Sequence, residues 1–84
     1  MRTKPAMPDD GVIRVGREKR RASSITIVYG LESRELSDVA SQLRKLCGTG
    51  GTAKNGAVEL QGDHRDRVVA YFQEKGRRVK RAGG

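Results

Sequence analysis

The sequence predicts an α+β fold, a two-layer plait in which two helices cover one face of a five-stranded mixed sheet. Three observations predict it: short β-branched runs, two segments with apolar residues at helical spacing, and the turn pair Asn55-Gly56. The predicted order is β-β-α-β-β-α-β, and its last six elements form the split βαβ pattern of ferredoxin-like plaits. Each predicted helix has one apolar stripe, so both should cover the same sheet face and leave the other face polar and solvated.

The first part of the chain reads as a tail followed by two strands. Residues 1–10 contain two prolines and two aspartates and few apolar side chains, so we expect a disordered tail before a single domain at residues 11–84. The apolar, β-branched residues 12–15 predict a strand. Residues 16–24 are polar and very basic, which predicts a loop, and the alternation at residues 25–29 predicts the second strand.

The first helix is predicted from an apolar stripe with spacings of three and four residues. Ser33 is a good residue to cap its beginning, and Gly48 is a good residue to end it. Acidic residues near the start and basic residues near the end also suit the helix dipole. The stripe consists of Leu36, Val39, Ala40, Leu43, Leu46 and Cys47.

A β-hairpin is predicted next. Asn55-Gly56 is a strong signal for a two-residue hairpin turn, because both residues tolerate positive φ. The turn lies between residues 52–54 and residues 57–61, which are the expected strands, and Gly62 ends the second of them.

The second helix and a last strand complete the expected fold. Asp63 is the expected N-cap of the helix, with Asp66 in the position of a capping-box partner. Gly76 should end the helix, and residues 77–82 should form a short strand. The buried stripe of the helix is expected to be Val68, Val69 and Phe72.

Charge is the strongest indication of function. Eighteen Lys and Arg face ten Asp and Glu, which gives a formal charge of +8 and a sequence pI of about 10.4. Clustered basic charge of this kind is typical of proteins that bind nucleic acids; the alternative is a basic surface without a polyanionic partner. A further basic cluster at residues 77–81 is explained more simply as protection of an edge strand. The expected RNA-binding residues are Arg17, Lys19, Arg20 and Arg21 in the first loop, and Arg44 and Lys45 at the end of the first helix.

Other classes of function find little support. No apolar run is long enough to span a bilayer, and no hydrophobic signal core begins the chain, so a soluble, cytoplasmic protein is expected. A single cysteine, Cys47, and a single histidine, His64, allow neither an intrachain disulfide nor a zinc site built from those ligands. No nucleophile lies beside a base, so we expect no catalytic residue, metal or cofactor. Tyr29 is the only aromatic in a predicted strand and shares a side with Ile25 and Ile27, which leaves phosphate contacts to structured RNA as the binding mode.

Three segments resemble the translation initiation factor 1 family, also called the suppressor-of-initiator-codon family. They are residues 44–52, residues 58–65 and residues 79–84, and the resemblance covers about residues 11–84. The most specific part is the strand-to-helix step Gln-Gly-Asp-x-Arg at residues 61–65. The resemblance implies a non-enzymatic, monomeric protein that binds small-subunit ribosomal RNA near the decoding site and influences start-codon selection, with initiator tRNA and other initiation factors as further partners.

The resemblance also assigns the basic residues. The family's basic loop corresponds to residues 17–21, and its basic helix end corresponds to Arg44 and Lys45. The chain departs from many relatives in a shorter loop, in Leu46 where a third basic residue is common, and in Thr49 where a second cysteine is common. Two alternatives remain at this stage. One is a general RNA-binding or stress-associated protein, and the other is an enzyme on the same scaffold, which no pair of nucleophile and base supports.

Overall fold

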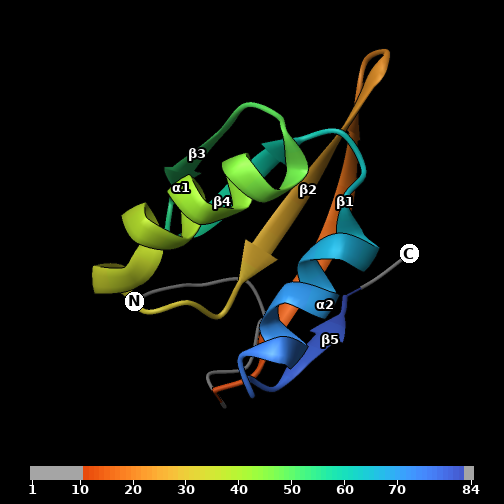
Figure 1. Cartoon of the computed structure of the whole chain (residues 1–84). Coiled ribbons are helices and arrows are strands. Elements are labelled where there is room, and N and C mark those ends of the chain that lie inside the picture. Colours follow the sequence, from red (N-terminus) through yellow and green to blue (C-terminus); the bar gives the residue numbers. More distant parts are fainter. Residues whose placement is uncertain (1–10, 83–84) are drawn as a thin grey trace, which may run out of the picture.

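A computed structural model describes residues 11–82 and shows five strands, two α-helices and a short 3-10 helix (Figure 1). The tail expected at residues 1–10 lies outside the described residues. The elements in chain order are β1 (Ile13–Arg20), β2 (Ser23–Tyr29), η1 (Ser33–Glu35), α1 (Leu36–Cys47), β3 (Gly51–Lys54), β4 (Ala57–Gln61), α2 (Arg65–Glu74) and β5 (Val79–Arg81).

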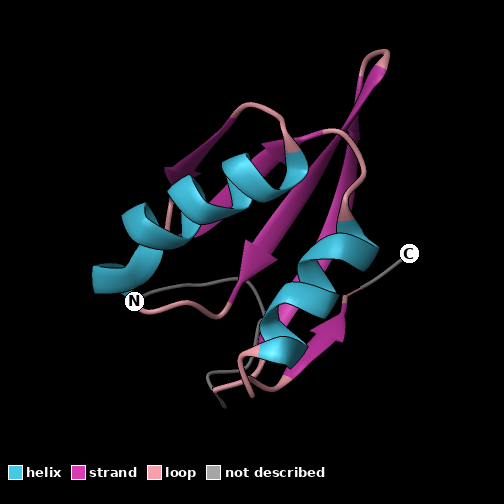
Figure 2. Cartoon of the chain, in the orientation of Figure 1, coloured by secondary structure: helices cyan, strands magenta, loops and turns pink. Residues whose placement is uncertain are grey.

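The sheet has the strand order β3-β4-β2-β1-β5, and both helices lie on the same face of it (Figure 2). All neighbouring strands are antiparallel except β1 and β5, which are parallel. The predicted α+β plait with a mixed five-stranded sheet is therefore confirmed. Relative to a ferredoxin-like core, β1 is inserted between β2 and β5, so the last strand pairs with the first strand of the chain.

The main core lies between the sheet and the two helices. Strand residues that alternate toward the helices meet the apolar stripes of α1 and α2, as the sequence periodicity predicts. Neither described helix is long and apolar enough to cross a membrane. The buried residues of this core are Ile13, Val15, Val28, Val39, Ala40, Leu43, Val58, Leu60, Val68 and Phe72.

The helix-free face of the sheet differs from the prediction. It was expected to be polar, but Ile25, Ile27 and Ala57 are buried there in a second apolar cluster, with Tyr29 packed against them. The expected sharing of one side by Ile25, Ile27 and Tyr29 is confirmed. The tyrosine ring lies beside Gly16 on the neighbouring strand, where a Cβ would be in ordinary contact with Tyr29 Cε2 at 3.8 Å. Strand β2 lies between β4 and β1 in the sheet, so side chains of both neighbouring strands flank those of β2 on this face.

The loop expected at residues 16–24 is instead the outer part of a β-hairpin. Strands β1 and β2 stay paired out to Arg20 and Ser23, and only a two-residue turn joins them. Arg21 takes a left-handed conformation in this turn, with φ of 53°. An antiparallel ladder satisfies the backbone whatever the side chains are, so polar residues can continue a strand beyond the core. We call residues 17–24 the basic arm.

The start of the first helix also differs from the prediction. Ser33 is not the N-cap; Glu32 is, and its side chain forms a capping box with Glu35 at the start of η1. The Glu35 carboxylate accepts a hydrogen bond from the Glu32 backbone N–H at 2.9 Å and two from the Arg77 guanidinium at 3.0 and 3.2 Å. Glu35 therefore joins the helix start to the segment before β5. The predicted end of α1 at Gly48 is confirmed.

The Glu35–Arg77 pair gives a pH-dependent prediction. Hydrogen bonds from Arg77 hold the pKa of the Glu35 carboxyl below its ordinary value. The pair therefore stabilises the fold above the unfolded-chain pKa, and this contribution is lost as the pH falls through the lower folded-state pKa. We expect Arg77→Gln to lower the free energy of unfolding at about pH 7 and to have a smaller effect at about pH 3, measured by urea titration. Arg78→Gln removes the same charge from a side chain without a described ion pair and is the control; equal losses for Arg77→Gln at both pH values would contradict the prediction.

Candidate nucleic-acid interface

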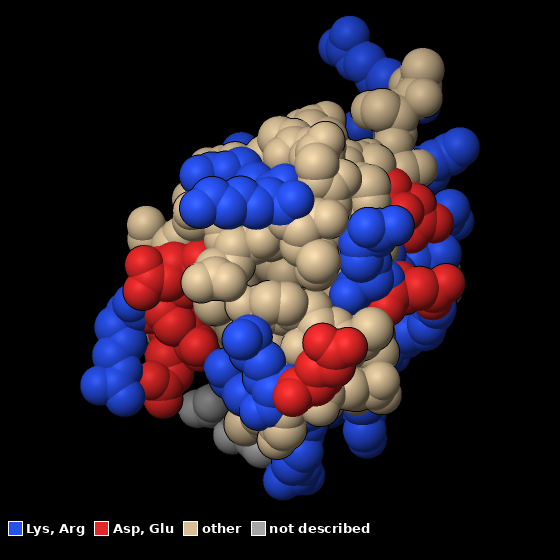
Figure 3. Space-filling model, in the orientation of Figure 1, with Lys and Arg blue, Asp and Glu red and all other residues tan. Residues whose placement is uncertain are grey.

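Three segments that are distant in the sequence meet at one end of the molecule (Figure 1). They are the basic arm, the C-terminal end of α1, and the connection from β4 into α2. Each contributes basic side chains, so this end is the candidate interface with a nucleic acid. Figure 3 shows basic side chains projecting from the arm at the top of the view, while acidic side chains lie lower on the molecule.

Two cations of the arm are unengaged. The side chains of Lys19 and Arg21 are exposed and have no ion-pair or hydrogen-bond partner among residues 11–82. Arg17, at the base of the arm, has its NH1 atom 3.7 Å from an Asp63 carboxylate oxygen, a long and exposed ion pair. Lys19 and Arg21 are thus the arm cations that can meet a phosphate without first leaving a carboxylate.

Arg20 is engaged by two carboxylates. Its NH2 atom lies 2.8 Å from Glu18 Oε1, and its NH1 atom lies 3.4 Å from Glu59 Oε1. Hydrogen bonds to Glu18, and secondly to Glu59, raise the pKa of the Arg20 guanidinium. The sequence grouped Arg20 with the other arm cations, but the structure gives it partners within the protein.

The end of α1 presents a second pair of cations. Arg44 donates from NH1 to the Gly51 carbonyl at 3.2 Å, which ties the helix end to the start of β3. Lys45 is exposed and has no side-chain partner in the described part of the chain. Leu46 beside them is 38% exposed, the one large apolar side chain that is open to solvent among residues 11–82.

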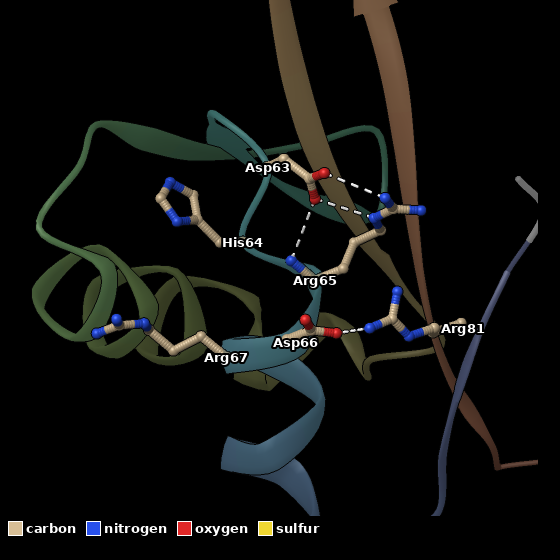
Figure 4. Close-up of a pocket in the computed structure, with 6 residues that line it drawn as sticks. All are labelled: Asp63, His64, Arg65, Asp66, Arg67 and Arg81. Atoms are coloured by element: carbon tan, nitrogen blue, oxygen red, sulfur yellow. Dashed lines mark hydrogen bonds and ion pairs between the residues drawn. The ribbon is translucent and has the colours of Figure 1, made fainter.

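Three arginines that the sequence reading did not select lie beside this surface. They line a cavity of about 250 Å³ at the start of α2 (Figure 4), whose lining residues are Asp63, His64, Arg65, Asp66, Arg67 and Arg81. Figure 4 shows Asp63 facing Arg65 and Asp66 facing Arg81, while His64 and Arg67 extend to the other side. Arg67 donates to the Leu46 carbonyl at 3.4 Å and so joins α2 to the end of α1.

A sequence signal for these arginines exists. Arg65 and Arg67 occupy the first turn of a helix, where the dipole disfavours cations. In the structure Arg65 forms an ion pair with Asp63. Arg67 donates a hydrogen bond to a carbonyl at the C-terminal end of α1, where the helix dipole is negative. A cation in the first turn of a helix therefore indicates a side chain that has a negatively charged or carbonyl partner outside that helix.

The motif at residues 61–65 is held together by a buried hydroxyl. Thr26 Oγ1 donates to the Gly62 carbonyl at 2.6 Å and accepts from the His64 N–H at 2.8 Å, and Thr26 is fully buried. His64 Nε2 lies 2.7 Å from the Gln61 carbonyl. Gly62 has φ of 94°, a conformation that residues with side chains rarely adopt, and a Cβ there would also lie 2.7 Å from His64 Nε2, so this step favours glycine.

The helix cap expected in this motif is different. His64, not Asp63, is the N-cap of α2, and it makes no side-chain capping bond. The Asp63 carboxylate instead accepts from Arg65 Nε at 2.9 Å and NH2 at 3.1 Å. These hydrogen bonds from Arg65 are the main reason why the pKa of the Asp63 carboxyl lies below its ordinary value. The carboxylate is drawn toward the guanidinium because a charged, two-point pair is stronger than a bond to a backbone N–H.

Comparison with known proteins identifies the family. The sequence pattern described as "Translation initiation factor SUI1" matches residues 9–78. The protein YciH of Salmonella typhimurium (strain LT2) is 39% identical over 99% of this chain and 82% of its own length. The "Protein translation factor SUI1 homolog" of Ignicoccus hospitalis is 45% identical over 83% of this chain and 70% of its own length. That of Hyperthermus butylicus is 48% identical over 77% and 66%, respectively.

The family match covers the arm, both helices and every strand before β5, and the similarity to the Salmonella protein extends over 99% of the chain. They support a role in translation initiation, and this group of translation factors is not a class of enzymes. The chain belongs to the translation initiation factor SUI1 family.

Proposed function

We propose that the protein binds ribosomal RNA of the small subunit near the decoding site and influences start-site fidelity in the cytoplasm. The family supports the role in initiation, and the basic arm supports the partner. The single observation that carries the proposal is an exposed hairpin whose cations Lys19 and Arg21 have no partner within residues 11–82. Unpartnered cations on a projecting element are suited to phosphate contacts in a groove or cleft.

The expected mode of binding is recognition of shape and charge. Tyr29 packs beside Ile27 on the helix-free face and does not offer the row of aromatic side chains on which single-stranded bases stack. The remaining source of affinity is phosphate contacts from the arm and from the end of α1. At the end of α1 we expect Lys45 to contribute more than Arg44, and in the arm we expect Arg17 to contribute less than Lys19 and Arg21, because Arg17 and Arg44 already have partners within the protein.

The mechanism that follows is occupancy. If the cations at the end of α1 bind the RNA, they would hold the arm close to the codon–anticodon region. There the arm would compete with incorrectly paired initiator complexes. Initiator tRNA and the other initiation factors are the partners expected beside such a site. Because the arm is a paired hairpin, it can hold its cations in place at a lower entropic cost than a flexible loop.

The test is co-sedimentation with purified small subunits, large subunits and bulk RNA over a range of salt concentrations. We expect saturable one-to-one binding to the small subunit, with a log–log salt slope on the order of −4 if about five phosphates are contacted. Equal binding to both subunits and to bulk RNA would overturn the proposal. It would favour the alternative of a general RNA-binding or stress-associated protein.

A further inference from the structure

The basic arm has two faces with different charge partners. Side chains alternate along a strand, so Arg17 and Lys19 point to the helix side of β1, and Glu18 and Arg20 point to the helix-free side. The partners agree with this alternation, since Arg17 meets Asp63 before α2 and Arg20 meets Glu59 on β4. Only the helix side of the arm carries a cation without a partner in the described chain.

The Arg20–Glu59 pair connects the arm to the body of the sheet. Arg20 pairs across the hairpin with Ser23, whereas Glu59 pairs with Ile27 on the other edge of β2. Along β2 the two positions are four residues apart, from 23 to 27, so the guanidinium reaches back diagonally over the sheet. Such a diagonal contact constrains how far the arm can swing away from β4.

Glu59 is built to need this partner. Its side chain is only 17% exposed, and it lies next to the apolar cluster on the helix-free face. Arg20 is the one cation that pairs with it among residues 11–82. Releasing Arg20 to a phosphate would therefore leave the Glu59 carboxylate without an ion pair in the described part of the chain.

We propose that Arg20 is a positioning residue: with Glu59 it holds the basic arm at a fixed angle to the sheet, so that Lys19 and Arg21 meet the RNA. This inference rests on the proposed RNA-binding function and assigns a division of labour within it. Arg20 then contributes to affinity through the direction of the arm and makes no phosphate contact of its own.

The expected effect has an upper limit. Exposed ion pairs contribute little free energy, and a contact that only orients the arm cannot add more to affinity than its own strength. We therefore expect loss of the pair to weaken small-subunit binding by about two- to five-fold. Loss of a true phosphate contact would in addition reduce the magnitude of the salt slope by about 1.

The sign of the Glu59→Gln effect separates the two roles. This substitution makes the protein more positive, so electrostatic attraction alone would strengthen RNA binding. Under the positioning role it removes the support of the arm, and binding weakens by the same two- to five-fold as in Arg20→Gln. Both variants should keep the wild-type salt slope, while Lys19→Gln, which has the same charge change as Arg20→Gln, should reduce it by about 1.

The exchanged pair Arg20→Glu with Glu59→Arg completes the experiment. It restores an ion pair while placing a negative charge on the arm, so the positioning role predicts recovery toward wild-type affinity relative to Arg20→Glu alone. Tighter binding by Glu59→Gln, a reduced slope for Arg20→Gln, or no recovery in the exchanged pair would each overturn the inference. Thermal unfolding of every variant checks the fold. Wild-type protein that shows no preference for the small subunit would instead contradict the proposed function.

Discussion

The double charge reversal Lys19→Glu with Arg21→Glu is expected to reduce small-subunit binding by about 10- to 100-fold at moderate salt. Both side chains are exposed on the basic arm and have no partner among residues 11–82, so reversal disturbs no described contact. Each is expected to make one charge-assisted contact with a phosphate, and a Glu in its place adds repulsion. Co-sedimentation or fluorescence anisotropy with purified subunits measures the change.

The salt dependence gives the same prediction a second readout. Two lost phosphate contacts should reduce the magnitude of the log–log slope by about 2. A reversal that lowers affinity without changing the slope would mean that these side chains act through something other than phosphate contacts. Measuring several salt concentrations therefore distinguishes lost contacts from a general decrease in attraction.

The matched control is Lys54→Glu with Arg78→Glu. Both double variants change two cations to anions, a change of −2 at each position, so both lower the formal charge from +8 to +4. Lys54 ends β3 beside the Asn55-Gly56 turn, and Arg78 precedes β5; both lie at the end of the sheet away from the arm (Figure 1). If the control weakened binding as much as the arm variant, net charge and not the arm would determine affinity.

Local signals predicted the framework of this fold. The apolar stripes of α1 and α2 place both helices over the sheet, because a helix with one apolar side has only one way to bury it. Asn55 and Gly56 both have positive φ in the hairpin turn, at 53° and 78°, as that residue pair predicts. These features depend on residues that are close in sequence.

Features that depend on distant pairs were missed. The basic arm looks like a loop because its strands carry charged residues, and only pairing between β1 and β2 reveals it. Glu18, one of the two partners of Arg20, is close in sequence, but the other partner, Glu59, lies 39 residues away. The apolar cluster on the helix-free face likewise needs the positions of neighbouring strands. Periodicity predicted which side of β2 these residues share, but not what covers that side.

The Thr26 hydroxyl offers a test of how much two buried hydrogen bonds contribute to the stability of the fold. We expect Thr26→Val to lower the free energy of unfolding by about 2 kcal/mol, and the melting temperature by about 8–16 °C. Valine fills the same space, so packing is kept. What is lost is the hydroxyl that donates to the Gly62 carbonyl and accepts from the His64 N–H, which are 36 and 38 residues away. Both backbone groups would be left without that partner in a part-buried site.

Thr26→Ser separates the hydrogen bonds from the packing. Serine keeps both bonds and loses one methyl group, so we expect a smaller loss of about 1 kcal/mol, measured by the same urea and thermal titrations. A loss for Thr26→Ser as large as that for Thr26→Val would show that packing, not the hydroxyl, makes Thr26 important. A larger loss for Thr26→Val than for Thr26→Ser would show that the motif at residues 61–65 stabilises the fold through its hydrogen bonds with Thr26. Its glycine and histidine fix the passage from β4 into α2 through a buried hydroxyl on β2, and the same passage places Asp63 beside Arg17 at the base of the basic arm.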